Sequence, residues 1–356
     1  MNLKNFLRAL VVAICLAGVA HAQPATAPST QQSRRGAGGG GGRQMRPPGP
    51  IVLEDIRIRD INILAEPATK TYYMVGPGGR GIVQYTSKDL VNWDGPRPVF
   101  TPPADVWGEI RTNSIWAPEI HKYKDKYYLF FTFDTRTPLP DPNPPTKPPR
   151  SQRPLVYRGS TIAVCDVPTG PFTALLPRSI PPQEMMTLDG TLWVEDGQPY
   201  MVFAHEWVQI TMGTIEAVKL KEDLSAPIDK PFLLFKAADA PWAKVQVEGG
   251  TVTDGPSFHV SKSGQLFMVW SSFDDQERYN VGLAISPSGK LAGPWIHQPQ
   301  ALYVENGGHP NLFKTFDGKL MLLFHAPNNN PQNRPHIFEL EDTGETLKLV
   351  RELSSK

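Results

Sequence analysis

Cysteine is almost absent from this sequence, which has 2 cysteines among 356 residues. Cys15 lies in an N-terminal apolar run, so Cys165 is the one cysteine expected in the processed chain. An internal disulfide is therefore excluded. The stability of the fold has to come from a packed core, for which a chain of this length is sufficient.

The sequence also lacks an excess of charge of one sign. It has 36 Lys and Arg against 35 Asp and Glu, a formal net charge of +1. Without a strong electrostatic field, neither nucleic acid nor an anionic membrane is expected as a partner. A glycine-rich phosphate loop, a paired-cysteine motif and a Ser/His/Asp arrangement are missing too, so we expect no organic cofactor.

The N-terminal apolar run, residues 9–19, is too short to span a bilayer. Lys4 and Arg8 precede it, and Ala20-His21-Ala22 fits the small-x-small pattern of a cleavage site. We predict a signal peptide over residues 1–22, export to the periplasm or the medium, and no membrane attachment after processing. An uncleaved membrane anchor is the alternative.

Two segments have the composition of exposed, unstructured chain. Residues 23–50 are rich in Pro, Gly, Gln and Ser, which bury little apolar area, and we interpret them as a disordered linker. A second proline-rich stretch, residues 138–149, is typical of a long exposed loop.

The remaining residues, 51–356, show short β-rich runs between turn signals and no long helical period. Four of five units follow one order: an acid or His, an apolar strand, a turn with Asp or Gly, and a second apolar strand. The leading residues are Asp60, Glu119, Asp189, Asp254 and His309, spaced by 59, 70, 65 and 55. This period suits four-stranded blades, so the pattern predicts an all-β, five-bladed β-propeller with these residues near one end of its axis.

Carboxylates gathered at a propeller axis suit cleavage of a glycosidic bond. One group protonates the leaving oxygen, and another activates water or attacks carbon. A third can raise the pKa of the acid, because a nearby negative charge disfavours ionisation.

The sequence resembles glycoside hydrolase family 43. The matching segments are Arg59-Asp60 before a strand with two tyrosines, and residues 87–93, 116–119, 169–172, 253–256 and 307–309. The resemblance implies a five-bladed propeller and inverting hydrolysis of arabinose- or xylose-containing glycans.

The resemblance also implies roles for single residues. Asp60 matches the general base, and Asp189 matches the carboxylate that tunes and orients the acid. Asp254 stands where the family usually has a Glu as general acid. Because Asp is one methylene shorter, Glu206 is a second candidate for the acid. His309 matches a residue that helps hold a metal, often calcium, at the axis of related enzymes.

Other assignments stay open at this stage. Trp116 and Trp207 either line a sugar site or pack in the core. Glu119 is expected in an axial structural or metal-shell role rather than in catalysis. We expect a monomer whose partner is a carbohydrate substrate. The alternatives to the predicted glycosidase are a carbohydrate-binding propeller without catalysis, and a propeller hydrolase for another linkage such as a galactoside.

Overall fold

The computed structural model describes residues 49–104, 107–108, 110–140, 151, 153–244 and 248–353. The predicted signal peptide, nearly all of the predicted linker and most of the predicted proline-rich loop lie outside these residues. Within them, no helix has the length and apolar character needed to cross a membrane. Cys165 is unpaired.

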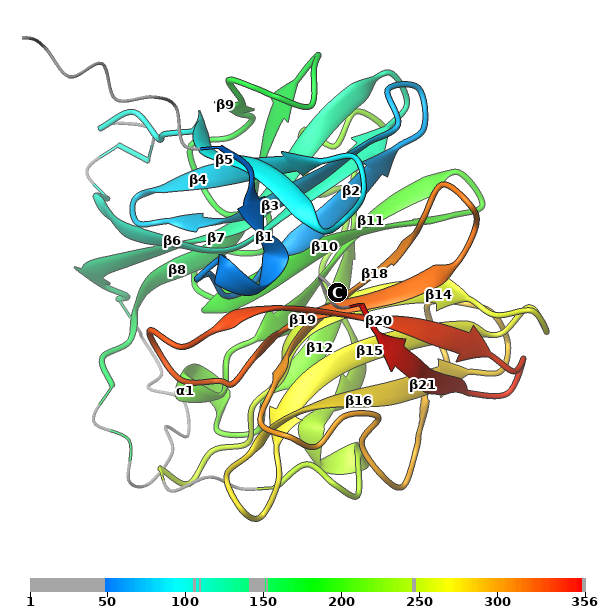
Figure 1. Cartoon of the computed structure of the whole chain (residues 1–356). Helices are drawn as coiled ribbons and strands as arrows, with labels where there is room; N and C mark the ends of the chain where they lie inside the picture. The colour runs from blue at the N-terminus through cyan, green and yellow to red at the C-terminus, as the bar shows by residue number, and fades with distance from the viewer. Residues whose placement is uncertain are drawn as a thin grey trace, which may run out of the picture. The chain divides into compact units, whose positions relative to one another are not determined.

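The structure consists of antiparallel sheets with almost no helix (Figure 1). The first sheet contains β2 (Asn62–Glu66), β3 (Thr71–Gly78), β4 (Gly81–Ser87) and β5 (Asn92–Phe100), with β1 (Ile51–Val52) on its outer edge. The second contains β6 (Thr112–Tyr123), β7 (Lys126–Pro138), β8 (Val156–Cys165) and β9 (Thr173–Ala174). The third contains β10 (Thr187–Glu195), β11 (Gln198–His205), β12 (Thr214–Lys219) and β13 (Phe232–Lys236).

The fourth sheet contains β14 (Asp254–Val260), β15 (Leu266–Phe273), β16 (Tyr279–Ser286) and β17 (Ile296–His297). The fifth contains β18 (Gly308–Lys314), β19 (Leu320–Ala326), β20 (Arg334–Asp342) and β21 (Leu347–Glu352). The helical turns are η1 (Leu53–Asp55), α1 (Trp207–Ile210) and η2 (Ala237–Asp239). The first strands of successive sheets contact one another, and β18 contacts β2, which closes the ring. The prediction of a five-bladed β-propeller is confirmed.

Each blade is held to the next by an apolar cluster, which explains the continuous apolar runs in the middle strands. In β15, Phe267 and Val269 pack against blade five, whereas Met268 and Trp270 pack against blade three. Because both faces of a middle strand are buried, the strand is apolar throughout instead of alternating with polar residues.

The innermost strands share a residue in the left-handed region of backbone conformation, with φ between 44° and 60°. In β6, β10, β14 and β18 this residue lies within a register shift, and in blade one it lies two residues before the start of β2. The five residues are Asp60, Ala117, Asp189, Gly255 and His309. Each blade therefore turns its first strand at the same place.

This register corrects two of the five leading positions expected from the sequence. Glu119 lies two residues after the left-handed position, and Asp254 lies one residue before it. The sequence pattern treated the acidic residues of the five units as equivalent. In the structure, the equivalent residues are instead those in the left-handed conformation. Asp60, Asp189 and His309 are equivalent, as expected.

A second set of equivalent residues forms a polar belt at the axis, defined here as Asn62, Glu119, Thr191, Ser257 and Asn311. Ile120 N donates to Asn62 Oδ1 at 3.0 Å, and Ile63 N donates to Asn311 Oδ1 at 3.1 Å. Thr191 Oγ1 donates to Glu119 Oε2 at 2.5 Å, and Leu312 N donates to Ser257 Oγ at 3.0 Å. Blades three and four are joined instead by Gly255 N, which donates to Asp189 Oδ2 at 3.0 Å. The belt thus satisfies backbone groups that face the axis.

Blades one and five share no strand, and besides a few hydrogen bonds such as Ile63 N to Asn311 Oδ1 their interface depends on apolar packing. Leu323 is fully buried in the apolar cluster that joins them. We expect Leu323→Ala to lower the free energy of unfolding by about 2–5 kcal/mol, because it removes a buried side chain and leaves a cavity. Leu233, in β13, is 49% exposed, and Leu233→Ala is the matched control. Thermal unfolding measures both, and equal losses of stability would contradict the expected role of this interface.

Candidate active site

One cavity of about 720 Å³ contains the catalytic, sugar-binding and metal-binding candidates selected from the sequence, but not Glu119. Its lining includes, among others, the following residues: Asp60, Trp116, Asp189, Glu206, Trp207, Asp254 and His309. They come from the first strand of each blade and from the segment at the end of β11. The cavity lies at the end of the axis where the innermost strands begin, which gathers residues up to 249 positions apart.

Asp60 is held as a carboxylate by its neighbours. Arg59 Nε donates to Asp60 Oδ2 at 2.9 Å, and His325 Nδ1 lies 3.3 Å from Asp60 Oδ1. Burial is the largest single effect and would raise the pKa of Asp60, but Arg59, His309 and His325 together outweigh it, and the pKa lies well below its usual range. Asp60 therefore carries a negative charge at any working pH.

The pKa values of Asp189 and Asp254 shift in the opposite direction, upward. Burial, the negative charge of Asp254 and that of Asp60 together raise the pKa of Asp189 well above its usual value. Burial also raises the pKa of Asp254 to about 7, and the charges of Asp60 and Glu206 act in the same direction. Tyr279 opposes this rise, because its hydroxyl donates to Asp254 Oδ2 at 2.9 Å. The site thus holds a proton on this pair of carboxyl groups near neutral pH.

Glu206, the second candidate for the acid, is bound by arginine. Arg158 Nη1 lies 2.5 Å from both carboxylate oxygens of Glu206, and Arg158 Nη2 donates to Asp134 Oδ1 at 2.8 Å. The Arg158 guanidinium also lies over the Trp116 ring, 4.3 Å from its centroid. Glu206 has to break this ion pair before either oxygen can carry a proton to a ligand.

The two tryptophans differ in exposure. Trp116 is half-buried at the cavity wall, and its Nε1 donates to Ser114 Oγ at 2.8 Å. Trp207 is 6% exposed and packs in an apolar cluster, with the Arg153 guanidinium 4.9 Å from its ring centroid. Trp116 therefore offers more surface to a ligand than Trp207, although both line the cavity.

His309 lies between two of the acids. Its Nδ1 is 3.5 Å from Asp189 Oδ2 and 3.8 Å from Asp60 Oδ1, and burial lowers its pKa. Among the described residues, no three His, Cys, Asp or Glu side chains are arranged to hold a metal ion. Since Ca²⁺ takes six to eight oxygen ligands, these side chains do not form a calcium site by themselves. The calcium expected from the sequence stays a prediction, and no chemical step here depends on it.

Four residues that contact the acids of the cavity were not predicted from the sequence: Arg59, Arg158, Tyr279 and His325. His325 is fully buried, its Nδ1 accepts a hydrogen bond from Asp60 N at 3.3 Å, and its Nε2 donates to Asn328 Oδ1 at 3.2 Å. A His directly after the apolar run of residues 320–324 was the available signal. Nothing in the sequence pairs Tyr279 with Asp254 or Arg158 with Glu206.

This arrangement provides the two protonation states that acid–base cleavage needs. Asp60 is an ionised carboxylate, and Asp254 retains a proton near neutral pH, within one cavity. Pairs of carboxyl groups whose environments separate their pKa values are suited to serve as base and acid.

Comparison with known proteins agrees with this chemistry. The family model described as Glycosyl hydrolases family 43 matches residues 56–341. The crystal structure of an endo-arabinase from Bacteroides thetaiotaomicron has a TM-score of 0.72 and 36% sequence identity, covering 83% of this chain and 98% of that one.

Two curated proteins are more distant relatives. An alpha-L-arabinofuranosidase B of Pyricularia oryzae is 24% identical over 261 residues, or 66% of this chain. The match spans 50% of the length of that fungal protein. An extracellular exo-alpha-(1→5)-L-arabinofuranosidase of Cellvibrio japonicus is 22% identical over 295 residues, covering 72% of this chain and 75% of the relative.

The raised pKa of Asp254 has a consequence for stability. Its folded value of about 7 exceeds the ordinary 3.8, so the folded state binds this proton more tightly, and stability falls as pH rises from 4 through 7. Asparagine cannot ionise, so we expect Asp254→Asn to gain stability relative to the natural chain as pH rises. The gain should be near zero at pH 4 and about 1–4 kcal/mol at pH 8.

Unfolding at a series of pH values measures this difference. Asp125→Asn, at an exposed turn residue, is the matched control and should show no such trend. A pH-independent difference between Asp254→Asn and the natural chain would mean that Asp254 ionises normally in the fold.

Proposed function

The chain belongs to family 43 of the glycosyl hydrolases, and we propose that it hydrolyses arabinose-containing glycans by an inverting mechanism. The observation that carries this proposal is the pair of carboxyl groups in one cavity, one ionised beside Arg59 and one protonated near neutral pH. The arabinan- and arabinoside-cleaving relatives favour arabinose over xylose as the sugar.

In this mechanism Asp60 is the general base. Its carboxylate takes a proton from water, which attacks the anomeric carbon from the side opposite the leaving group. Arg59 keeps Asp60 ionised, and the left-handed backbone at Asp60 directs the carboxylate into the cavity next to His309.

Asp254 is the general acid that protonates the leaving glycosidic oxygen. Its pKa of about 7 suits an acid that works near neutral pH, and the negative charges of Asp60 and Glu206 support this state. Asp189, in the same cavity, is the carboxyl group positioned to orient it. Asp254 lines the cavity itself, so its shorter side chain can contact a ligand there. Glu206 instead holds Arg158 against Trp116, and the indole of Trp116 lines the sugar site.

A non-catalytic binding propeller is the second candidate. It would not require a proton to be held on Asp254 while Asp60 stays ionised, and this difference favours the enzyme. We further propose that the protein acts outside the cytoplasm, which the signal-like N-terminus and the extracellular Cellvibrio relative support.

The stereochemistry of the product tests the mechanism. Proton NMR of a fresh digest of an arabino-oligosaccharide should show first the anomer of inverted configuration, followed by slow mutarotation. Inversion requires the base and the acid about 6.5–9.5 Å apart, so that a water fits between the base and the sugar. A first-formed product of retained configuration would exclude the inverting mechanism.

Asp60→Asn tests the base. The amide keeps the size of the side chain but does not accept a proton from water, so kcat should fall by roughly 10²- to 10⁴-fold. Asp55→Asn, in the exposed turn η1, is the matched control and should leave kcat unchanged. Near-normal turnover of a folded Asp60→Asn protein would assign Asp60 a structural role.

The identity of the acid is tested with two leaving groups. A good leaving group departs without protonation, so loss of the acid affects natural glycans far more than activated aryl arabinosides. Asp254→Asn should lose turnover on arabino-oligosaccharides and retain much of it on the activated substrate. Glu206→Gln should lower both rates alike, because it disturbs the Arg158 ion pair. Leaving-group dependence confined to Glu206→Gln would move the acid to Glu206.

A further inference from the structure

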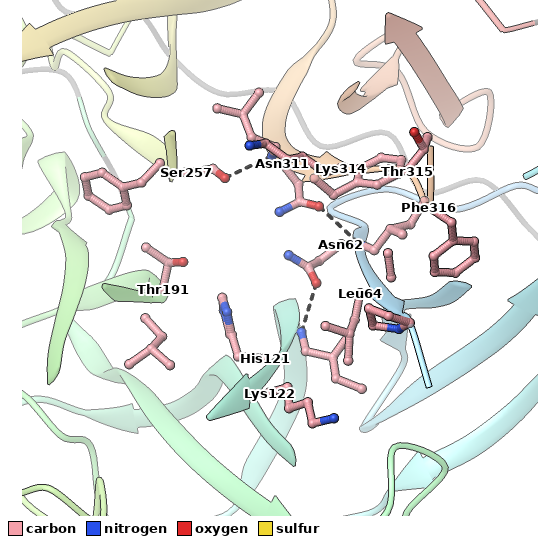
Figure 2. A pocket seen from close by; sticks show the side chains of 18 of the residues that line it. Asn62, Leu64, His121, Lys122, Thr191, Ser257, Asn311, Lys314, Thr315 and Phe316 are labelled. Atoms are coloured by element: carbon pink, nitrogen blue, oxygen red, sulfur yellow. Dashed lines mark hydrogen bonds between the residues drawn. The ribbon is translucent and has the colours of Figure 1, made fainter. Parts of the chain in front are cut away.

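A second cavity, of about 600 Å³, shares no lining residue with the catalytic cavity. Figure 2 shows the polar-belt residues Asn62, Thr191, Ser257 and Asn311 around it, together with His121. These side chains come from all five innermost strands, at the part of each strand beyond the left-handed residue. The volume lies within the range of small-molecule sites.

The centre of this cavity presents hydrogen-bond donors. Asn62 Oδ1 and Asn311 Oδ1 each accept a backbone N–H from the next blade, which fixes the orientation of both amides. Their Nδ2 groups therefore point away from those bonds and toward the open centre (Figure 2). Neither Nδ2 group donates to another described residue. The blades thus hold two amide donors in place before any ligand arrives.

The charge of the lining has one sign. It includes Lys70, Lys122 and Lys314, and no Asp or Glu. Lys122 Nζ donates to Glu66 Oε2 at 2.9 Å, so its charge is partly compensated. Lys70 and Lys314 are exposed and form no ion pair with a described residue. An anionic group in this cavity would meet donors and positive charge and no lining carboxylate.

Aromatic side chains complete the wall: Trp193, Phe258, Phe313 and Phe316. Phe316 is held by stacking on Tyr72, with the ring centroids 4.3 Å apart. Trp193 is likewise held against Phe258, with centroids at 5.1 Å. Rigid aromatic faces beside fixed polar donors suit a ring that has an apolar face and polar edges, as a sugar does.

We propose that this cavity binds an acidic saccharide of one or two rings, whose carboxylate or phosphate lies against the Asn62 and Asn311 amides and whose ring contacts the aromatic wall. The site goes beyond the proposed hydrolytic function. It lies at the other end of the belt from the catalytic cavity and provides a second contact with a charged glycan or glycan fragment.

Isothermal titration calorimetry of the full chain tests the site with three probes: digalacturonate, glucose 6-phosphate and the neutral disaccharide cellobiose. At least one acidic probe should bind about tenfold or more tightly than cellobiose, and its affinity should fall as salt rises. The acidic probe that binds identifies the anion as a carboxylate or a phosphate.

Two sets of variants localise the binding. Asn311→Asp keeps the oxygen that accepts Ile63 N but replaces the amide donors by negative charge, so affinity should fall by about tenfold or more. The double variant Lys70→Asn with Lys314→Gln should also weaken binding, and it alters only exposed side chains. Lys348→Gln, at an exposed position on β21, is the matched control.

Turnover of arabino-oligosaccharides should stay normal in the lysine variants, so a failure of this site is distinguishable from a failure of the proposed function. The proposal is overturned if neither acidic probe binds, if cellobiose binds equally well, or if both sets of variants bind like the natural chain.

Discussion

The inner edges of the five blades impose the constraint on which the rest of the structure depends. An innermost strand has a sheet partner on one side only, so its other backbone groups face the axis and need partners there. Side chains of the polar belt accept several of these N–H groups, as Asn62 Oδ1 does for Ile120 N. Each bond joins one blade to the next, so satisfying the backbone also closes the ring.

The backbone of the innermost strands also shapes the catalytic cavity. Each innermost strand turns through one left-handed residue, and in blades one and three that residue is Asp60 or Asp189. A left-handed conformation disfavours most side chains, although Asp tolerates it better than most. The bulge that lets one strand bond to its neighbours therefore also directs carboxylates toward a common centre. His309 occupies the equivalent position in blade five and lies between them.

The carboxyl groups of the cavity are all buried, and their protonation states differ because their neighbours differ. Asp60 has a guanidinium at hydrogen-bond distance and two histidines nearby, which together outweigh its desolvation. Asp254 has only the Tyr279 hydroxyl, so burial and the nearby negative charges prevail. Glu119 lies between the two cavities: it accepts from Thr191 in the belt, and its charge contributes to the raised pKa of Asp189.

The sequence by itself determined the fold and the acidic residues of the catalytic cavity. The apolar middle strands and the fivefold order of motifs predict the propeller, because a strand buried on both faces must be apolar throughout. The catalytic, sugar-binding and metal-binding candidates selected from the sequence line one cavity, whereas Glu119 does not. Only the tertiary structure decided the register at the axis, where Ala117 and Gly255 replace Glu119 and Asp254 as the equivalent residues. It also decided which acid meets Arg59, Tyr279 or Arg158. These pairings lie beyond sequence reasoning because a bulge changes the direction of the side chains that follow it. In addition, the partner of Asp254 lies two strands away in the same blade, and the partner of Glu206 comes from the neighbouring blade.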